Sequence, residues 1–184
     1  MTNEELWGLF PIILVEHNAI WLKRYSKEKK VLEQVVGTQN IIRINHIGST
    51  VVPNLIAKPT IDILLEIKDD AVIKRLIANI QKAGYIYKEQ PNNPAPHMMF
   101  MKGYTPKGFK GQVFHLHVRY SGDWDELYFR DYLLRHPEIA DEYGKLKLEL
   151  QKKYEHDRDG YTYAKTDFIK RIMKLARAVI SNEY

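Results

Sequence analysis

Hydrophobic side chains recur with a helical spacing near the start of the chain and again in its last third. Over residues 18–36 they return every three or four positions and end at Gly37, which predicts an amphipathic helix. A second such helix is predicted from Asp70 to Gly84. From Trp124 onward the pattern is helical alone: WDELYFRDYLLRH, then PEIADEYGKLKLELQKKY, and after HDRDG a last helix that should bury Phe168, Ile169, Ile172, Met173, Ala176 and Val179.

Apolar runs of another kind predict strands in the middle of the chain. IIRINHI and TIDILLEI form a strand pair, and YIYKE, HMMFMKG and VFHLHVRY form a meander, with the loop QPNNPAP and the glycine-flanked turn KGFKGQ between its strands. This order predicts an α+β fold, with helices packed on one side of a mixed sheet. We expect one domain over residues 1–184, with the sheet core over about 18–120 and a helical part over about 121–184.

Alternation along two of the strands identifies a polar face. In VFHLHVRY the apolar side chains share one face, so His115, His117 and Arg119 share the other. In TIDILLEI the face opposite the isoleucines holds Thr60, Asp62, Leu64 and Glu66. An acid within such a run is costly unless it is paired, protonated or bound to a metal. Asp62 is therefore a candidate site residue, and a turn cap or a pair with Lys58 is the structural alternative.

Composition narrows the class of protein. The 184 residues are 45% hydrophobic and 28% charged, as in ordinary globular domains, and the net charge of +5 fits a phosphate-bearing partner as well as a lysine-rich solvated surface. The absence of cysteine excludes disulfides, zinc-thiolate sites and thiol nucleophiles. The N-terminal run LWGLFPIILV follows two glutamates and is too short to span a membrane, so we expect a cytoplasmic protein with no membrane partner. Without a concentrated basic stripe, nucleic acid is not expected as the main partner.

A Gly-Ser-Thr turn lies between the two paired strands. The backbone amides of Gly48 and Ser49, with the serine hydroxyl, are groups that can hold a phosphate. For His46, just before the turn, a hydrogen bond to the backbone is favoured over a ligand role. A half-exposed strand explains His115 and His117 about as well as a site does.

Ordered motifs along the chain resemble the GrpB family. The family hallmark, close to HIGSTAVPGLxAKPxIDI, is matched by HIGSTVVPNLIAKPTIDI, and further matches are the HLH strand, FRDYLxxHP at 129–137, YxxLK at 143–147 and YTYAKTDFI at 161–169. The family is similar in fold to the polymerase-beta-like nucleotidyltransferases. Some of its members are joined to a dephospho-coenzyme A kinase, which hints at nucleotide or coenzyme metabolism.

In that superfamily a Gly-Ser turn leads to a strand with two metal-binding acids one residue apart. The resemblance places Asp62 at the first acid and implies that His115 or His117 faces it from a later strand. The second acid should stand at position 64, where this chain has Leu64. Glu66 cannot replace it, because four strand residues span roughly 13 Å and a metal holds its ligands within roughly 2.6 Å. This departure argues against a two-metal mechanism.

The resemblance leaves three functions to compare. The first is a metal-dependent nucleotidyl- or phosphoryltransferase acting on a nucleotide or coenzyme-like small molecule. In it Asp62, Ser49 and His117 are catalytic, Asp62, His115 and His117 hold Mn, Zn or Mg, and the phosphates contact Gly48, Ser49, Thr50, Lys58, Arg130, Lys147 and Lys165. The second is a binding module that has lost its chemistry, favoured by Leu64. The third is a transition-metal hydrolase or lyase that uses Asp62 with both histidines.

Overall fold

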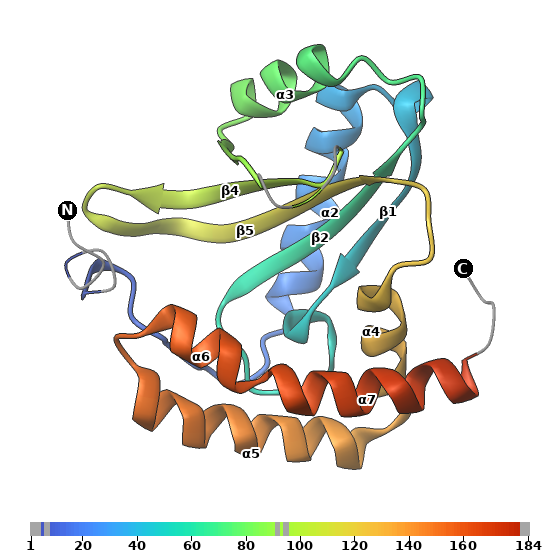
Figure 1. The fold of residues 1–184 in the computed structure, drawn as a ribbon. Coiled ribbons are helices and arrows are strands. Elements are labelled where there is room, and N and C mark those ends of the chain that lie inside the picture. The colour runs from blue at the N-terminus through green and yellow to red at the C-terminus, as the bar shows by residue number, and fades with distance from the viewer. Residues whose placement is uncertain (1–4, 6–7, 91–92, 94–95, 181–184) are drawn as a thin grey trace.

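A computed structural model of the chain contains a five-stranded sheet flanked by helices (Figure 1). It describes residues 5, 8–90, 93 and 96–180. Parts of two sequence predictions lie outside these residues: Leu6 and Trp7 of the N-terminal apolar run, and Pro91, Asn92, Pro94 and Ala95 of the predicted loop.

The sheet joins the predicted strand pair to the predicted meander. Its order is β1-β2-β5-β4-β3, and all neighbours are antiparallel except β2 and β5, which are parallel. The strands are β1 (Ile41–Ile47), β2 (Thr60–Ile67), β3 (Ile86–Lys88), β4 (Met98–Thr105) and β5 (Gly108–Tyr120). This mixed sheet with its helices confirms the α+β prediction.

Two helices cover one face of the sheet and enclose the main core. The isoleucine face of β2 packs against buried side chains of both helices, such as Leu32 and Ile80, which are fully buried. Burial of these apolar groups is the main stabilising contribution of this layer. The two helices are α2 (Ile20–Val36) and α3 (Ile73–Lys82).

The later helices do not join that layer. On the opposite face Leu127 packs against Ile47 and Leu64, so the prediction that the helices lie on one side is wrong for the helix that carries Leu127. The helices beyond it lie at the end of the sheet where β1 ends and β2 begins (Figure 1), because Val52 and Leu55 of the connecting loop insert among them. The helix that carries Leu127 is α4 (Asp125–Arg135), and the helices beyond it are α5 (Pro137–Tyr154), α6 (Arg158–Ala164) and α7 (Thr166–Val179).

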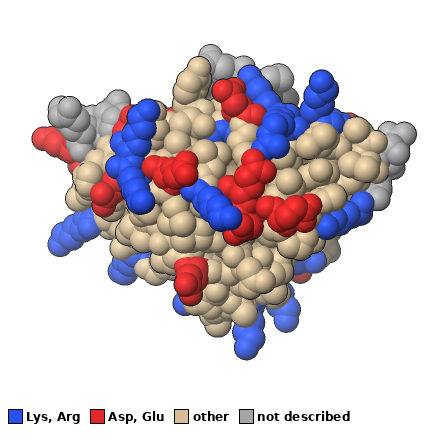
Figure 2. All heavy atoms as spheres, turned by 90° about the horizontal axis from the view of Figure 1, so that it is seen from below, with Lys and Arg blue, Asp and Glu red and all other residues tan. Residues whose placement is uncertain are grey.

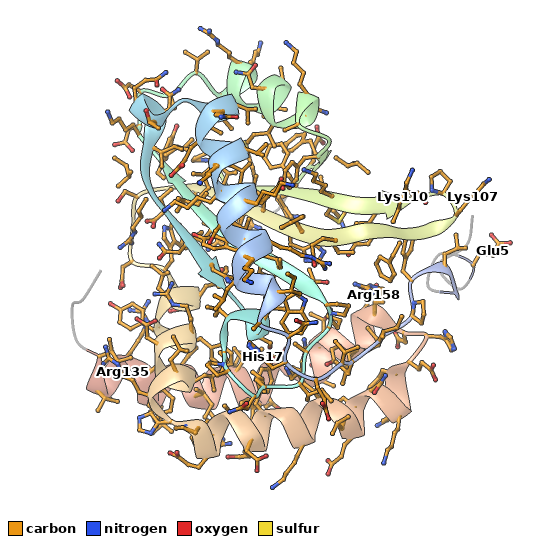
Figure 3. All side chains as sticks on the ribbon, turned by 180° about the vertical axis from the view of Figure 1, so that it is seen from behind. Glu5, His17, Lys107, Lys110, Arg135 and Arg158 are labelled. Atoms are coloured by element: carbon orange, nitrogen blue, oxygen red, sulfur yellow. The ribbon has the colours of Figure 1, made fainter. Side chains whose placement is uncertain are left out.

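Three details of the sequence prediction are corrected. KGFKGQ is not the hairpin turn, because β5 already begins at Gly108 and the turn falls on Pro106 and Lys107. Lys107 points away from the protein at this hairpin tip (Figure 3). Two helices follow His156 where one was predicted after HDRDG. The first begins within that segment at Arg158, and the Asp157 side chain caps it by accepting a hydrogen bond from the Gly160 amide. Val179 is exposed, since it occupies the last turn of α7.

The surface formed by the C-terminal helices carries charges of both signs. Figure 2 shows lysine and arginine side chains interspersed with acids on this face. Two of the pairs are Lys145 with Asp141 along α5 and Arg171 with Glu142 between α7 and α5. None of the helices that the described residues form is long and apolar enough to cross a membrane.

Candidate functional site

A cavity of about 880 Å³ opens on the face of the sheet that carries Asp62. Its wall includes residues of β2, β3, β4 and β5, the Gly-Ser turn, helices α5 and α6, and the N-terminal segment at Leu9 and Phe10. Its volume is typical of sites for small molecules. Of the predicted site residues, the following line it: Gly48, Ser49, Lys58, Asp62, His115, His117, Lys147 and Lys165.

The Gly-Ser turn approaches Asp62 closely because it contains a glycine. Gly48 has φ 74°, and a Cβ atom there would lie 2.6 Å from the Asp62 carboxylate. The turn then forms the short 3₁₀ helix η2 (Ser49–Val51). Thr50 does not line the cavity, because it is buried behind the turn, where its hydroxyl is 2.9 Å from Nε2 of His46. The partner of His46 is thus this hydroxyl and not the backbone, and burial lowers the pKa of His46 to about 4.

Asp62 lies between two histidines of the neighbouring strand. Because β2 and β5 pair in parallel with Asp62 opposite His115, its Oδ1 is 3.4 Å from Nδ1 of His115 and 3.9 Å from Nε2 of His117. Burial alone would raise the pKa of Asp62, but its interactions with the two imidazoles outweigh burial and hold that pKa well below its usual range. The carboxylate is therefore ionised at neutral pH, and the expected meeting of Asp62 with both histidines occurs.

Tyr104 completes a chain of polar groups that ends at Asp62. Its hydroxyl is 2.7 Å from Nε2 of His115, whose other ring nitrogen faces Asp62. Simple alternation would place Tyr104 on the face of Lys102, towards α2, but the strand register shifts at Gly103, which has φ 91°. A bulge of this kind redirects the side chains that follow it. His115 is thus engaged at both ring nitrogens.

Three lysines from separate parts of the chain face the same region. Lys147 is buried, and its ammonium donates hydrogen bonds to the Ser49 hydroxyl, at 3.0 Å, and to the Ile56 carbonyl. Lys58 and Lys165 are half-buried, and their ammonium groups lie 5.5 and 4.5 Å from the centre of the Tyr161 ring. No ion pair joins any of these three lysines to an acid within the described part of the chain.

The lining of the cavity carries more positive than negative side chains. Burial, followed by repulsion from neighbouring cations, lowers the pKa of Lys58 and of Lys147 to about 7. Burial also lowers the pKa of Lys165 to about 8, although the charge of Asp62 opposes this shift. The described cationic lining residues are Lys58, Lys88, Lys147, Arg158 and Lys165, against the acids Asp62 and Asp159. An anionic ligand would offset this excess of positive charge.

Binding of an anion should therefore be accompanied by uptake of protons. At pH 8 the free protein holds Lys58 and Lys147 largely deprotonated, and a phosphate beside them favours the charged form and raises the pKa of both. With tripolyphosphate as the anionic probe, we expect calorimetry at pH 8 to give different enthalpies in Tris and in HEPES, with net proton uptake, and an affinity that falls as the pH rises from 7 towards 10. Equal enthalpies in the two buffers would contradict this expectation.

The same lysines affect the stability of the free protein. Because the pKa of each is lower in the folded chain than in the unfolded one, the unfolded state binds more protons between about pH 7 and pH 10.5. The contribution of these lysines to stability therefore rises with pH across that interval. It is lowest below pH 7, where Lys58 and Lys147 are charged, since burial disfavours the charged form and neighbouring cations repel it.

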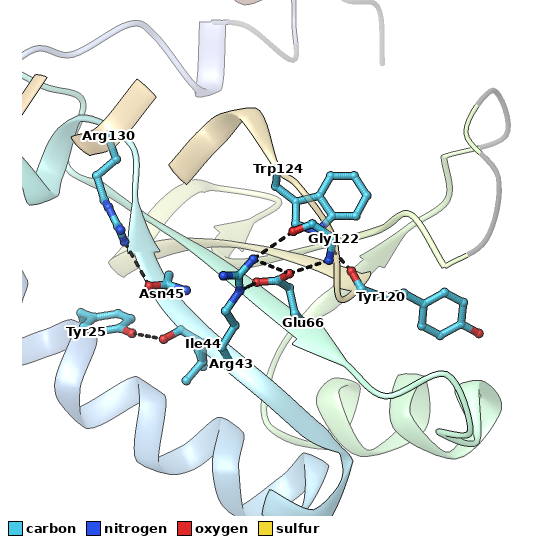
Figure 4. A network of polar contacts seen from close by, with 9 residues as sticks. All are labelled: Tyr25, Arg43, Ile44, Asn45, Glu66, Tyr120, Gly122, Trp124 and Arg130. Atoms are coloured by element: carbon cyan, nitrogen blue, oxygen red, sulfur yellow. Dashed lines mark hydrogen bonds and ion pairs between the residues drawn. The ribbon is translucent and has the colours of Figure 1, made fainter. Parts of the chain in front are cut away.

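Arg130 does not reach the cavity. Its guanidinium donates to the Asp131 carboxylate, to the Asn45 side chain and to the His46 carbonyl, as Figure 4 shows for Asn45. Arg130 thus ties α4 to the end of β1 just before the Gly-Ser turn. The prediction that it contacts phosphate is not supported by its position, and its role here is to hold the strand.

Arg158 is a cavity residue that the sequence analysis missed. It lies between α6 and the β4–β5 hairpin (Figure 3), donates to the Phe10 carbonyl at 3.0 Å and lies over the Phe109 ring. The only signal was its place three residues before the YTYAKTDFI motif. Tyr104 had no such signal, because the bulge that redirects it is not visible in the alternation.

The positions after Asp62 on the same face are structural. Leu64 is fully buried against Ile47 and Leu127, so the place of the second acid belongs to a hydrophobic cluster. Glu66 is fully buried and paired with Arg43 and the Gly122 amide (Figure 4), and it does not line the cavity. The expectation that Glu66 cannot serve as the missing ligand agrees with this position.

The structure offers fewer candidate metal ligands than the sequence analysis expected. In the part of the chain that the structure describes, no group of three or more His, Asp or Glu side chains is arranged to hold a metal ion. His115 is held by Tyr104 and Asp62, which leaves Asp62 and His117 as candidate ligands. A single ion bound there would need further ligands from a bound phosphate or from water, and a carboxylate with an imidazole suits manganese or zinc better than magnesium.

Comparison with known proteins identifies relatives along almost the whole chain. The family described as GrpB protein matches residues 11–175. The chain is 36% identical over 160 residues to a UPF0157 protein of Pseudomonas aeruginosa, covering 86% of this chain and 64% of that one. It is 32% identical over 165 residues to the glutamate-rich protein GrpB of Alkalihalophilus pseudofirmus, covering 88% and 94%. It spans only 48% of a third relative, the UPF0157 protein YqkA of Bacillus subtilis, at 34% identity over 90% of this chain.

Solved structures agree with these matches. The crystal structure of conserved protein GrpB from Enterococcus faecalis superposes with a TM-score of 0.77 at 31% identity, over 89% of this chain and 96% of that one. The Cid1 poly(U) polymerase, in a structure with MgGTP bound, gives a TM-score of 0.51 at 10% identity, over 88% of this chain and 52% of that one. The second likeness shows a nucleotidyltransferase-like fold and nothing more. Because the family model matches residues 11–175, which is most of the chain, the chain belongs to the GrpB family.

Proposed function

We propose that the cavity binds the phosphates of a nucleotide or coenzyme-like small molecule and that the protein transfers its nucleotidyl or phosphoryl group to an acceptor. The observation that carries this proposal is the set of three lysines around Ser49 and Asp62 with no acid paired to them in the described residues. Cations that lie close together without an acid paired to them cost stability, and an anionic ligand would offset that cost. The fold shared with a polymerase that binds MgGTP agrees with a nucleotide.

The roles follow from the positions of the groups. Lys147 and the Ser49 hydroxyl would hold one phosphate. Lys58 and Lys165 would stabilise the charge of the leaving group, which is pyrophosphate in nucleotidyl transfer and the nucleoside diphosphate in phosphoryl transfer. The acceptor hydroxyl would attack phosphorus and give its proton to His117, which lies beside the anionic Asp62. Where Asp62 and His117 instead hold a metal ion, that ion would supply positive charge next to the phosphates, and the proton of the acceptor would pass to water.

A second function is favoured by one observation. The chain has Leu64 at the place of the second acid of a two-metal site. Leu64 is enclosed by apolar side chains, so no small movement of the strand would bring another acid to this place. The protein would then be a module that binds the same ligand without turning it over. Binding alone does not separate these two functions, whereas turnover does.

Lys165→Met tests the phosphate site, and Lys170→Met is the matched control, since Lys170 is an exposed lysine on α7. First, a thermal-shift screen of the four nucleoside triphosphates and of dephospho-coenzyme A, with magnesium, manganese or zinc, identifies the best probe. Lys165→Met should then weaken binding of that probe roughly 10- to 100-fold, as expected for a lost hydrogen bond between charged groups. Lys170→Met should leave binding unchanged.

The unfolding temperature separates loss of binding from loss of fold. Since Lys165→Met removes a cation whose pKa burial depresses, the variant should melt at the same temperature as the wild type or higher. Unchanged affinity in Lys165→Met, or no stabilisation by any phosphate compound, would refute the phosphate site. Stabilisation by a transition metal without any nucleotide would instead favour the hydrolase.

A further inference from the structure

Two rows of side chains cross the cavity face of the sheet from β2 to β3. Strand pairing places Asp62 beside His115, His115 beside Met101, and Met101 beside Ile86. The second row is Leu64, His117, Met99 and Lys88. Neighbouring strands are about 4.8 Å apart, so the first row is about 14 Å long. The chemistry changes along it from carboxylate and imidazole to thioether and alkyl groups.

Three side chains towards the far end of these rows form an apolar shelf, namely Ile86, Met99 and Met101, and Lys88 ends the second row at its edge. Ile86 is 50% exposed and the two methionines are partly exposed. None of the three belongs to a hydrophobic cluster of the described residues, whereas Phe100, which points to the other face of β4, is fully buried beneath the helices. The open face of an antiparallel strand is ordinarily polar. The apolar character of β4 on this open side therefore needs a reason other than packing within the chain.

The shelf and the three lysines line one continuous cavity. We infer that the shelf binds the ring-bearing or apolar end of the molecule whose phosphates lie among the lysines; this rests on the proposed function. The ligand is then elongated, with phosphates near Ser49 and a planar or apolar group about three strand spacings away. A bare phosphate or polyphosphate would leave the shelf uncovered. The occupant is thus a phosphate ester of such a group.

The chemistry of the shelf also limits its selectivity. Alkyl groups form no hydrogen bonds, and thioethers are weak acceptors that adapt to rings of different shape. Discrimination between nucleobases requires placed donors and acceptors. The shelf should therefore favour any base over none and discriminate little among the four.

Calorimetry with ATP, GTP, CTP, UTP and tripolyphosphate tests the shelf. In the wild type we expect the four nucleotides to bind with affinities within about 5-fold of one another. Each should bind at least about 10-fold tighter than tripolyphosphate, because the base of a nucleotide covers the apolar shelf and tripolyphosphate does not. Met101→Thr and Ile86→Thr should weaken ATP roughly 5- to 10-fold and leave tripolyphosphate unchanged. Ile42→Thr is the matched control, since Ile42 is 48% exposed on β1, away from the cavity.

The outcomes separate the two proposals. If tripolyphosphate binds as tightly as ATP and Lys165→Met weakens both, the phosphate site stands and the shelf is refuted. Unchanged ATP affinity in both shelf variants refutes the shelf as well. If neither ATP nor tripolyphosphate binds, the phosphate site fails and the shelf with it.

Discussion

Asp62→Asn is expected to lower turnover of the best nucleotide by about 100-fold or more while the protein stays folded. Asparagine has the same shape, but it lacks the negative charge that faces His115 and His117. Without that charge His117 loses the group that would stabilise its protonated form, and a metal ion loses its only carboxylate ligand at this point. Release of pyrophosphate or of nucleoside diphosphate, measured beside the unfolding temperature, checks the result.

The control for this variant is Asp159→Asn, because Asp159 also lines the cavity but is exposed on α6. That change should alter turnover by less than about 3-fold, as expected for a solvated charge. Equal turnover by wild type and Asp62→Asn would refute the catalytic role of Asp62. A wild type that binds nucleotide, turns over none and binds it equally well as Asp62→Asn would identify the protein as a binding module.

Glu66→Ala should have the largest effect on stability, with a loss of about 3 kcal/mol and a fall in unfolding temperature of roughly 6–12 °C. Glu66 is fully buried, and its carboxylate accepts from the Arg43 guanidinium and, at 3.0 Å, from the Gly122 amide (Figure 4). Alanine leaves Arg43 and that amide without this partner. Urea unfolding followed by circular dichroism measures the change.

Glu142→Ala is the matched control for Glu66→Ala. Glu142 pairs with Arg171 at the surface, where both side chains are half exposed, so its loss should cost less than about 1 kcal/mol. Comparable losses in the two variants would contradict a special role for the buried pair. Ligand binding should survive Glu66→Ala below its unfolding temperature, since Glu66 does not line the cavity.

Local patterns predicted much of the fold. The helix PEIADEYGKLKLELQKKY has the predicted bounds, Pro137–Tyr154, because proline at its first position and a continuous helical spacing both mark it. The alternation in VFHLHVRY put both histidines on the face that Asp62 shares. The hairpin turn was misplaced because Gly108 and Gly111 were read as turn residues, whereas their positive φ angles serve an irregular strand.

The candidate site was predictable only in part. Asp62 and its histidines follow from alternation and family resemblance, since both depend on short segments. Tyr104 depends on a bulge, and Arg158 depends on how α6 packs against the N-terminal segment, neither of which has a periodic signature. For Arg130 the motif gives the identity of the residue but not its direction, and in the fold it points to the end of β1.

The loop that follows the Gly-Ser turn has a consequence for how the chain is held together. Val52 and Leu55 pack this loop against the C-terminal helices. The Lys147 ammonium donates a hydrogen bond to the Ser49 hydroxyl, although the two residues are 98 positions apart in the sequence. A phosphate bound by both Ser49 and Lys147 would act as a reversible cross-link between the sheet and α5. The occupied protein should then resist proteolysis and forced separation of these two parts much as a disulfide-bridged chain does, although the chain contains no cysteine.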